Sequence, residues 1–100
     1  MQLEILPEAF EELAQAVDWL NDDRVGLGEE LVDAVDLAVR GLLRAPFIGA
    51  PVPHRKLSEE HRRMLVRRFR YVVIYRIRGD VLQVVAIAHT SRSQTYWMGR

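Results

Sequence analysis

The chain has 100 residues, of which 49% are hydrophobic and 28% are charged. This length and composition suit one small domain with a modest core and exclude a disordered tail. The absence of cysteine excludes a disulfide framework and a thiolate metal site.

Neither the interior nor the start of the chain predicts a membrane segment. No apolar run approaches the roughly 20 residues that span a bilayer. The N-terminal stretch MQLEILPEAF lacks the basic region and the apolar region of a signal peptide. We therefore expect a cytoplasmic protein without a membrane partner.

The formal net charge of zero hides an asymmetry between the two halves of the chain. Residues 1–39 carry eleven acidic residues and one basic residue, whereas residues 40–100 carry thirteen basic and three acidic residues. Such a split indicates a basic surface that faces a polyanion or an acidic partner. Alternatively, the two halves neutralise each other across the fold.

The N-terminal half predicts a short strand and then a helix. Leu3 and Ile5 alternate with polar residues, as in a strand. Pro7 suits the first turn of a helix, where its missing N–H costs nothing. The apolar residues that recur at helical spacing are Phe10, Leu13, Val17 and Leu20. The polar stretch Asn21-Asp22-Asp23 is expected to end this helix.

A second helix is predicted from about Val25 to Ala45. Pro46 restricts the residue before it and ends the helix. The apolar positions of this helix are Leu27, Leu31, Val35, Ala38 and Leu42, widened by Val32, Val39 and Leu43. Two long helices joined by a short polar break form an antiparallel hairpin.

Three strands are predicted in the C-terminal half, after a loop at residues 46–53. They are RMLVRR (63–68), YVVIYRIR (71–78) and VLQVVAIAH (81–89). Gly79-Asp80 predicts a tight hairpin between the last two. The order strand, helix, helix, strand, strand, strand predicts an α+β domain spanning residues 1–100. In it the helical hairpin packs on a mostly antiparallel sheet.

The segment 68–78 has two different faces, because side chains alternate along a strand. The first face is expected to lie in the core and carries Phe69, Tyr71, Val73, Tyr75 and Ile77. The second face carries Arg68, Arg70, Val72, Ile74, Arg76 and Arg78. This second face predicts an exposed apolar patch rimmed by arginines, suited to acidic residues of a protein partner or to phosphates.

Several residues of the C-terminal half form a pattern. Phe69, Tyr71 and Tyr75 lie on an arginine-flanked strand, His89 ends the next strand, Arg92 follows three residues later, and Tyr96-Trp97 lie near the end. With this pattern and the helical segment EAFEELAQAVDWL, the chain resembles the RelE/ParE superfamily of bacterial type II toxins. The resemblance implies the fold derived above, a cognate antitoxin and a toxin–antitoxin hetero-oligomer.

The RelE-like branch of this superfamily cleaves mRNA in the ribosome. Metal-free RNA cleavage needs a base, cations for the phosphate and an acid for the leaving oxygen. In this chain the residues that would supply them are Arg63, Arg67, His89, Arg92 and Tyr96. The set is incomplete, because Leu65 and Val72 stand where RelE-like toxins commonly carry basic residues, and Lys56 is the only lysine.

The ParE-like branch poisons DNA gyrase, and its pattern fits better. Arg70 and Gln94 depart from it, because prolines are frequent at both positions. No cofactor is expected, and His54 and His61 match no metal-ligand spacing. Gyrase inhibition is therefore the predicted function. A RelE-like endonuclease acting on ribosome and mRNA, and an inactive toxin-like binding module, are the alternatives.

A set of residues is expected to contact the target or the antitoxin. These are Arg68, Arg70, Val72, Ile74, Arg76, Arg78, Arg92 and Trp97. Two of the aromatic residues have alternatives, because Trp97 can plug the sheet and Trp19 can either cover the first helix or anchor a protein contact. His89 either caps the last strand or acts as an acid or base. Arg92 is the strongest single functional candidate.

Overall fold

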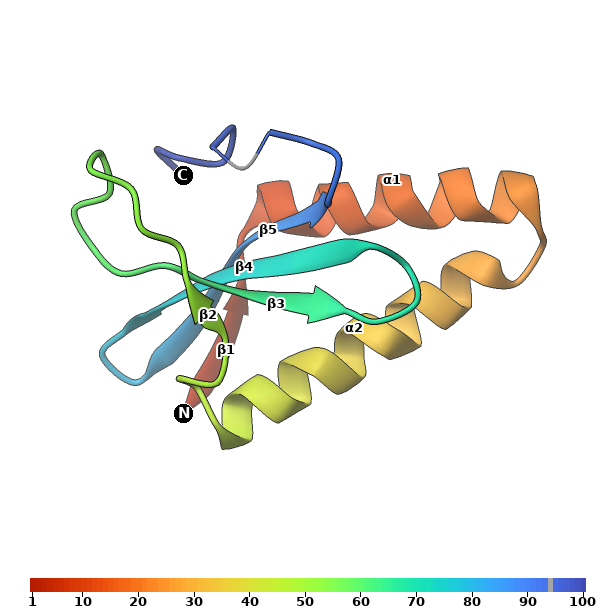
Figure 1. The fold of residues 1–100 in the computed structure, drawn as a ribbon. Coiled ribbons are helices and arrows are strands. Elements are labelled where there is room, and N and C mark those ends of the chain that lie inside the picture. Colours follow the sequence, from red (N-terminus) through yellow and green to blue (C-terminus); the bar gives the residue numbers. More distant parts are fainter. Residues whose placement is uncertain (94) are drawn as a thin grey trace.

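Two antiparallel helices cover one face of a sheet (Figure 1). The computed structural model describes residues 1–93 and 95–100, so the expectation for Gln94 falls outside the described residues. Helix α1 spans Pro7–Asp23 and helix α2 spans Leu27–Arg44. The predicted helical hairpin is confirmed.

The sheet contains five strands in the order β1-β5-β4-β3-β2. They are β1 (Gln2–Ile5), β2 (Ala50–Pro51), β3 (Arg62–Val66), β4 (Tyr71–Arg78) and β5 (Val81–His89). Strand β1 pairs parallel with β5, and the other pairs are antiparallel. The predicted α+β class is confirmed, and β4 and β5 have the predicted bounds. The two-residue β2 was not predicted, because its prolines and glycine indicated a loop.

Helix α1 continues through the polar stretch that was expected to end it. The Asn21 side-chain oxygen accepts a hydrogen bond from the main-chain N–H of Gly28 at 2.8 Å. Asn21 thus provides an acceptor for one of the N–H groups in the first turn of α2, which have no partner within the helix. The chain reverses just before α2, where Gly26 has a φ of +92° that favours glycine. Phe10 was expected on the buried stripe but is 64% exposed.

Both faces of β4 and β5 are buried. The core on the helix side contains Val73, Tyr75, Leu82, Val84 and Ile87 from these strands. The core on the opposite face contains Val72, Ile74, Val85, Ala86 and Ala88, together with Trp97. A sheet with two dry faces explains why these strands are almost continuously apolar.

A bulge in β5 allows this strand to serve both cores. Ile74 pairs with Ala86, whereas the next residue, Tyr75, pairs with Val84, so Val85 is the extra residue. One extra residue reverses the alternation of side chains beyond it. Val84 and Ile87 therefore both face the helices, although they are three positions apart.

The prediction of an exposed apolar patch on β4 is wrong. Val72, Ile74 and Trp97 are all buried. The C-terminal segment, residues 95–100, covers this face together with the loop residues Val52 and Leu57. The alternation of side chains along β4 correctly assigned residues to its two faces. It could not predict that segments distant in sequence cover the second face.

Strand β3 ends at Val66, and residues 67–70 form a turn. Arg68 and Arg70 therefore do not belong to the β4 face on which they were expected. Their φ values are +80° and +57°, in the left-handed region that costs a non-glycine residue about 1–2 kcal/mol. Proline is fixed at negative φ, so this turn excludes it at position 70. At position 70, where the family pattern usually has proline, this chain therefore has a backbone conformation that proline cannot adopt.

The loop after α2 is fixed to the sheet by Tyr75. The Tyr75 hydroxyl donates to the Pro46 carbonyl at 2.7 Å and accepts from the Gly49 N–H at 3.1 Å. A Cβ atom at Gly49 would lie 2.5 Å from the hydroxyl oxygen and 2.9 Å from the Arg63 carbonyl oxygen. Only glycine fits between the tyrosine and the neighbouring strand.

We expect Gly49→Ala to lower the free energy of unfolding by about 1–3 kcal/mol, because the added methyl group overpacks this contact. Gly41→Ala is the matched control. A Cβ atom at Gly41 would meet nothing within 4 Å, and alanine in a helix should add up to about 1 kcal/mol of stability. Urea unfolding of both variants measures the difference. Equal effects of the two changes would contradict the close contact.

Candidate functional site

The outer edge of β5 is only partly covered by another strand. Strand β1 ends at Ile5, opposite Val84, so no strand lies beside the rest of this edge in the described part of the chain. The Ile87 N–H donates to Glu12 Oε1 at 3.1 Å, and the Val85 carbonyl accepts from Arg100 Nη1 at 3.1 Å. Glu12 of α1 and Arg100 of the C-terminal segment thus form the hydrogen bonds that a neighbouring strand would otherwise form with this part of β5.

Glu12 is the centre of this connection, and its side chain is only 10% exposed. Its two carboxylate oxygens lie 2.8 and 3.3 Å from the guanidinium nitrogens of Arg100. The Tyr96 hydroxyl donates to Oε2 at 2.5 Å, and Arg92 Nη1 lies 3.6 Å from the same oxygen. The arrangement holds the C-terminal segment beside the first turns of α1 (Figure 1).

Tyr96 is fixed by both charge and stacking. Its ring centroid lies 3.8 Å from the guanidinium carbon of Arg92 and 5.1 Å from that of Arg100. Burial raises the pKa of Tyr96 well above its usual value, and the hydrogen bond to Glu12 raises it further. The phenol is therefore a weak acid whose proton is directed at Glu12.

A groove lies between α1 and the end of β5. Trp19 contributes from α1, Tyr71 from β4, and His89 and Arg92 from the end of β5 and the segment after it. Two pockets of about 260 and 270 Å³ share Trp19, Tyr71 and His89. We call this feature the Trp19–Arg92 groove. Trp19 is 66% exposed and the Arg92 side chain is 57% exposed, so both are accessible to a partner.

His89 caps the turn after β5. Its Nδ1 accepts the main-chain N–H of Ser91 at 3.1 Å and lies 2.7 Å from the Ser91 hydroxyl oxygen. A ring nitrogen that accepts an N–H carries no proton, so the neutral imidazole carries its proton on Nε2. The His89 ring also meets Tyr71 edge-to-face, with 5.2 Å between centroids. These contacts support the structural role considered for His89.

The sequence and the fold of this chain are similar to those of known proteins. The family model described as "ParE toxin of type II toxin-antitoxin system, parDE" matches residues 3–94. The chain belongs to the ParE toxin family. Among solved structures it is similar to a chain of the "Chromosomal ParDE TA system from P. aeruginosa", with a TM-score of 0.75 and 19% sequence identity. The match covers 89% of this chain and 95% of that chain, and shows a shared fold. The search of curated proteins found no match.

In this ParE-family chain, the five candidates for RNA cleavage fall into two groups. His89, Arg92 and Tyr96 lie around the groove and Glu12. Arg63 lies on β3 opposite Ile74, and Arg67 lies in the turn that follows β3. Since β4 separates β3 from β5, the two groups lie on different sides of the central strand.

Arg76 was expected at the rim of an exposed patch, but its side chain is 6% exposed. Its Nε donates to Gln83 Oε1 at 2.5 Å, and its Nη1 donates to the main-chain oxygen of Arg100 at 2.8 Å. Its Nη1 also lies 3.4 Å from Nε2 of His61, whose ring stacks on Trp97 at 5.2 Å. Arg76 therefore fastens the C-terminal segment to the sheet, and the prediction that it lies at an exposed rim is wrong.

Two of the other expected contact arginines, Arg68 and Arg78, are exposed and form internal ion pairs. Arg78 Nη2 lies 2.5 Å from Glu59 Oε1, and Arg68 Nη2 lies 2.7 Å from Glu30 Oε1. These hydrogen bonds lower the pKa values of both glutamates. Exposed pairs of this kind contribute little stability, so a partner can displace them at small cost.

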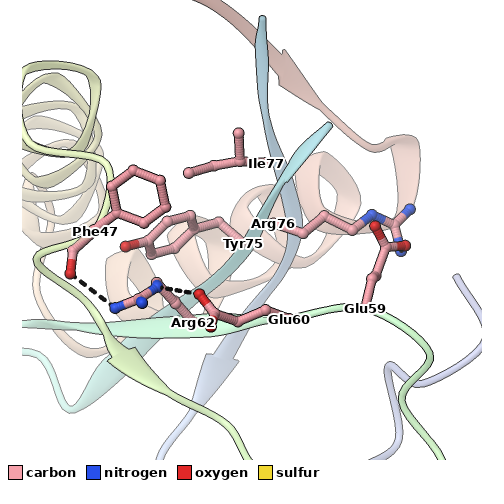
Figure 2. Close-up of a pocket in the computed structure, with 7 residues that line it drawn as sticks. All are labelled: Phe47, Glu59, Glu60, Arg62, Tyr75, Arg76 and Ile77. Atoms are coloured by element: carbon pink, nitrogen blue, oxygen red, sulfur yellow. Dashed lines mark hydrogen bonds and ion pairs between the residues drawn. The ribbon is translucent and has the colours of Figure 1, made fainter. Parts of the chain in front are cut away.

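Another pocket, of about 340 Å³, lies beside the C-terminal half of β4 (Figure 2). Its charged side chains already interact with the fold. Arg62 donates to the Phe47 carbonyl at 2.8 Å and to Glu60 at 2.6 Å, as the dashed lines show. The Tyr75 hydroxyl is used by the loop, and Arg76 and Glu59 take part in the contacts described above. The side chains that line this pocket therefore hold the loop after α2 against the sheet.

Residues 1–93 and 95–100 contain no group of three or more His, Asp or Glu side chains that could hold a metal ion. None of the helices among them is long and apolar enough to cross a bilayer.

Glu12 gave no functional signal in the sequence. It lies off the apolar stripe of α1, among several acids near the helix N-terminus, where the helix dipole favours acids in general. Its partners Ile87, Tyr96 and Arg100 are 75, 84 and 88 positions away. A residue whose role depends on such distant groups carries no local pattern.

We expect Glu12→Gln to lower the free energy of unfolding by about 1–3 kcal/mol, because it removes the charge that Arg92 and Arg100 share. The variant should also let Tyr96 ionise at lower pH, which ultraviolet titration of the phenols measures. Glu11→Gln is the control, since Glu11 is an exposed neighbour on the same helix. If both variants unfold and titrate alike, Glu12 does not hold the C-terminal segment.

We expect a loss of stability as the pH falls below about 6.5. Burial lowers the pKa of His61 from its ordinary 6.5, and the nearby Arg76 charge lowers it further. The unfolded chain therefore binds more protons than the folded chain in this range. The contribution is complete above pH 6.5 and decreases as the pH falls through the folded pKa. Urea midpoints between pH 7 and pH 5 should lose this slope in His61→Asn, and an unchanged slope would contradict the assignment.

Proposed function

We propose that this ParE-family chain is a toxin that inhibits DNA gyrase and is neutralised by a cognate antitoxin. The observation that carries the choice of target is the state of Tyr96. RNA cleavage would need it as the acid for the leaving oxygen. Its proton is directed at Glu12, and its pKa is raised above the usual value. This disfavours the mRNA-cleaving alternative.

The position of the arginines supports a role in gripping a partner. Strand β3 ends, β4 begins and β5 ends at the same end of the sheet, because these strands are antiparallel. The main-chain N–H of Thr90 donates to the Arg70 carbonyl at 2.8 Å, which joins the turn to the segment after β5. This end of the sheet presents the exposed residues Arg67, Arg68, Arg70 and Arg92. They suit an acidic surface of a protein target in the cytoplasm.

We expect Arg92→Ala, and the double variant Arg68→Ala with Arg70→Ala, to relieve growth inhibition while the protein stays folded. Each should raise the concentration that halves gyrase supercoiling by about tenfold, as for loss of a central interface contact. Arg40→Ala is the control, because Arg40 is exposed on α2 and pairs with Asp36. Full toxicity of the variants at equal expression would contradict the site.

The target itself is tested with purified toxin freed of antitoxin. Loss of supercoiling with trapped cleaved DNA, and normal cell-free translation, would support gyrase inhibition. Blocked translation with message cut at the ribosome would overturn it in favour of an mRNA endonuclease. If both reactions run normally, the chain is an inactive binding module.

A further inference from the structure

His61 is a buried titratable side chain that the proposed function does not use. It lies just before β3 and is 3% exposed. Its Nδ1 lies 3.1 Å from the main-chain oxygen of Glu59, and its Nε2 lies 3.4 Å from Arg76 Nη1. A carbonyl oxygen only accepts and a guanidinium only donates, so Nδ1 carries the proton and Nε2 is an acceptor. The two contacts therefore fix a neutral imidazole.

The C-terminal segment is attached to the sheet through this ring and through Arg76. The Trp97 ring stacks on His61 with 5.2 Å between centroids, and Arg76 Nη1 donates to the main-chain oxygen of Arg100 at 2.8 Å. Trp97 is buried against Val72 and the rest of the core on the face opposite the helices. His61 and Arg76 together thus hold residues 95–100 over this face.

The charges around His61 oppose a second proton on its ring. The charged residues that line the pocket beside it are Lys56, Glu59, Arg76, Arg78 and Arg100. Burial lowers the pKa of His61 most. The Arg76 and Arg78 charges lower this pKa further, whereas the contacts with Glu59 raise it. The Glu59 carboxylate is already paired with Arg78 at 2.5 Å. A second proton would lie on Nε2, against the N–H groups of Arg76.

The C-terminal segment is the part of the fold that yields to such a proton. Residues 95–99 form turns, whereas β4 pairs with β5 along its whole length. Turns at the end of a chain open at a lower free energy than the strands of a core. Once His61 and Arg76 repel each other, the contacts of Tyr96 and Arg100 with Glu12 are left to hold the segment.

We propose that His61 and Arg76 form a proton-sensitive switch, in which protonation of His61 Nε2 releases the C-terminal segment while the sheet stays folded. Release exposes the face of β4 and β5 beneath Trp97. It also removes the Tyr96 ring from the Arg92 guanidinium, whose carbon lies 3.8 Å from the ring centroid. The switch depends on the fold alone, whichever target the toxin binds.

Release becomes more favourable as the pH falls, because the docked His61 ring has the lower pKa. In the released state the ring returns to its ordinary pKa of 6.5. Between 6.5 and the pKa of the docked ring, the equilibrium constant for release should rise by up to about tenfold per pH unit. Above pH 6.5 the segment stays docked.

Toxin labelled with 5-fluorotryptophan tests the switch, in the Trp19→Phe background that leaves Trp97 as the one indole. Fluorine NMR follows Trp97 and carbon-detected NMR follows the His61 ring, from about pH 7.5 downward. We expect the Trp97 resonance to move to that of an exposed indole with the same midpoint as His61, while circular dichroism still shows the sheet. A Trp97 that stays buried beside a fully protonated His61 would overturn the proposal. A ring that stays neutral until the sheet unfolds would overturn it too.

Matched histidine variants identify the group that titrates. His61→Gln keeps one donor and one acceptor but cannot take up a charge, so Trp97 should stay buried over the same pH range. His54→Gln is the control, because His54 lies in the same loop and its Nδ1 accepts the Lys56 N–H at 3.1 Å. It should keep the original midpoint. If Trp97 in His61→Gln moves at the original midpoint, another group is responsible and the proposal is wrong.

Glu59→Gln gives a second test that keeps the His61 ring, in case glutamine at position 61 cannot dock the segment at any pH. The change keeps the main-chain oxygen that His61 contacts and removes a charge that raises the pKa of His61. The midpoint of the Trp97 transition should therefore move to lower pH. An unchanged or higher midpoint would contradict the switch.

Discussion

A carboxylate that is removed from water must be matched by cations and hydrogen-bond donors, and Glu12 meets this requirement with groups from two other parts of the chain. The Ile87 N–H comes from the strand edge that β1 leaves open, and Tyr96 and Arg100 come from the C-terminal segment. The same carboxylate thus joins the helix layer to the segment that covers the opposite face. Without it, the Ile87 N–H and the Arg100 guanidinium would both lose their carboxylate partner.

Burial of both faces of β4 and β5 decides which residues remain for function. On the face opposite the helices, Trp97 and the loop before β3 cover Val72 and Ile74, and Arg76 is used to hold the cover. These residues contribute to the fold. Exposed charged side chains lie instead at one end of the sheet. There a strained turn with two arginines at positive φ is hydrogen-bonded to the segment after β5. Strained positions that persist in a small fold often lie where a protein meets its partner.

The exposed end of the sheet and the Trp19–Arg92 groove meet at Arg92. The Glu12 carboxylate and the ring of Tyr96 both contact the Arg92 guanidinium, whose carbon lies 3.8 Å from the ring centroid. A side chain that is held in this way loses less conformational freedom when it enters a further contact.

The sequence by itself determined the α+β class, the helical hairpin, the bounds of β4 and β5, and the family pattern through Phe69, Tyr71, Tyr75, His89 and Arg92. These follow from local periodicity and turn chemistry, which a chain carries in neighbouring residues. The tertiary structure decided that Val72, Ile74 and Trp97 are core, that Arg76 is buried, and that Glu12 lies at the centre of the site. Their environments depend on segments tens of residues away, and the extra residue at Val85 shifts the alternation in a way that no local pattern shows.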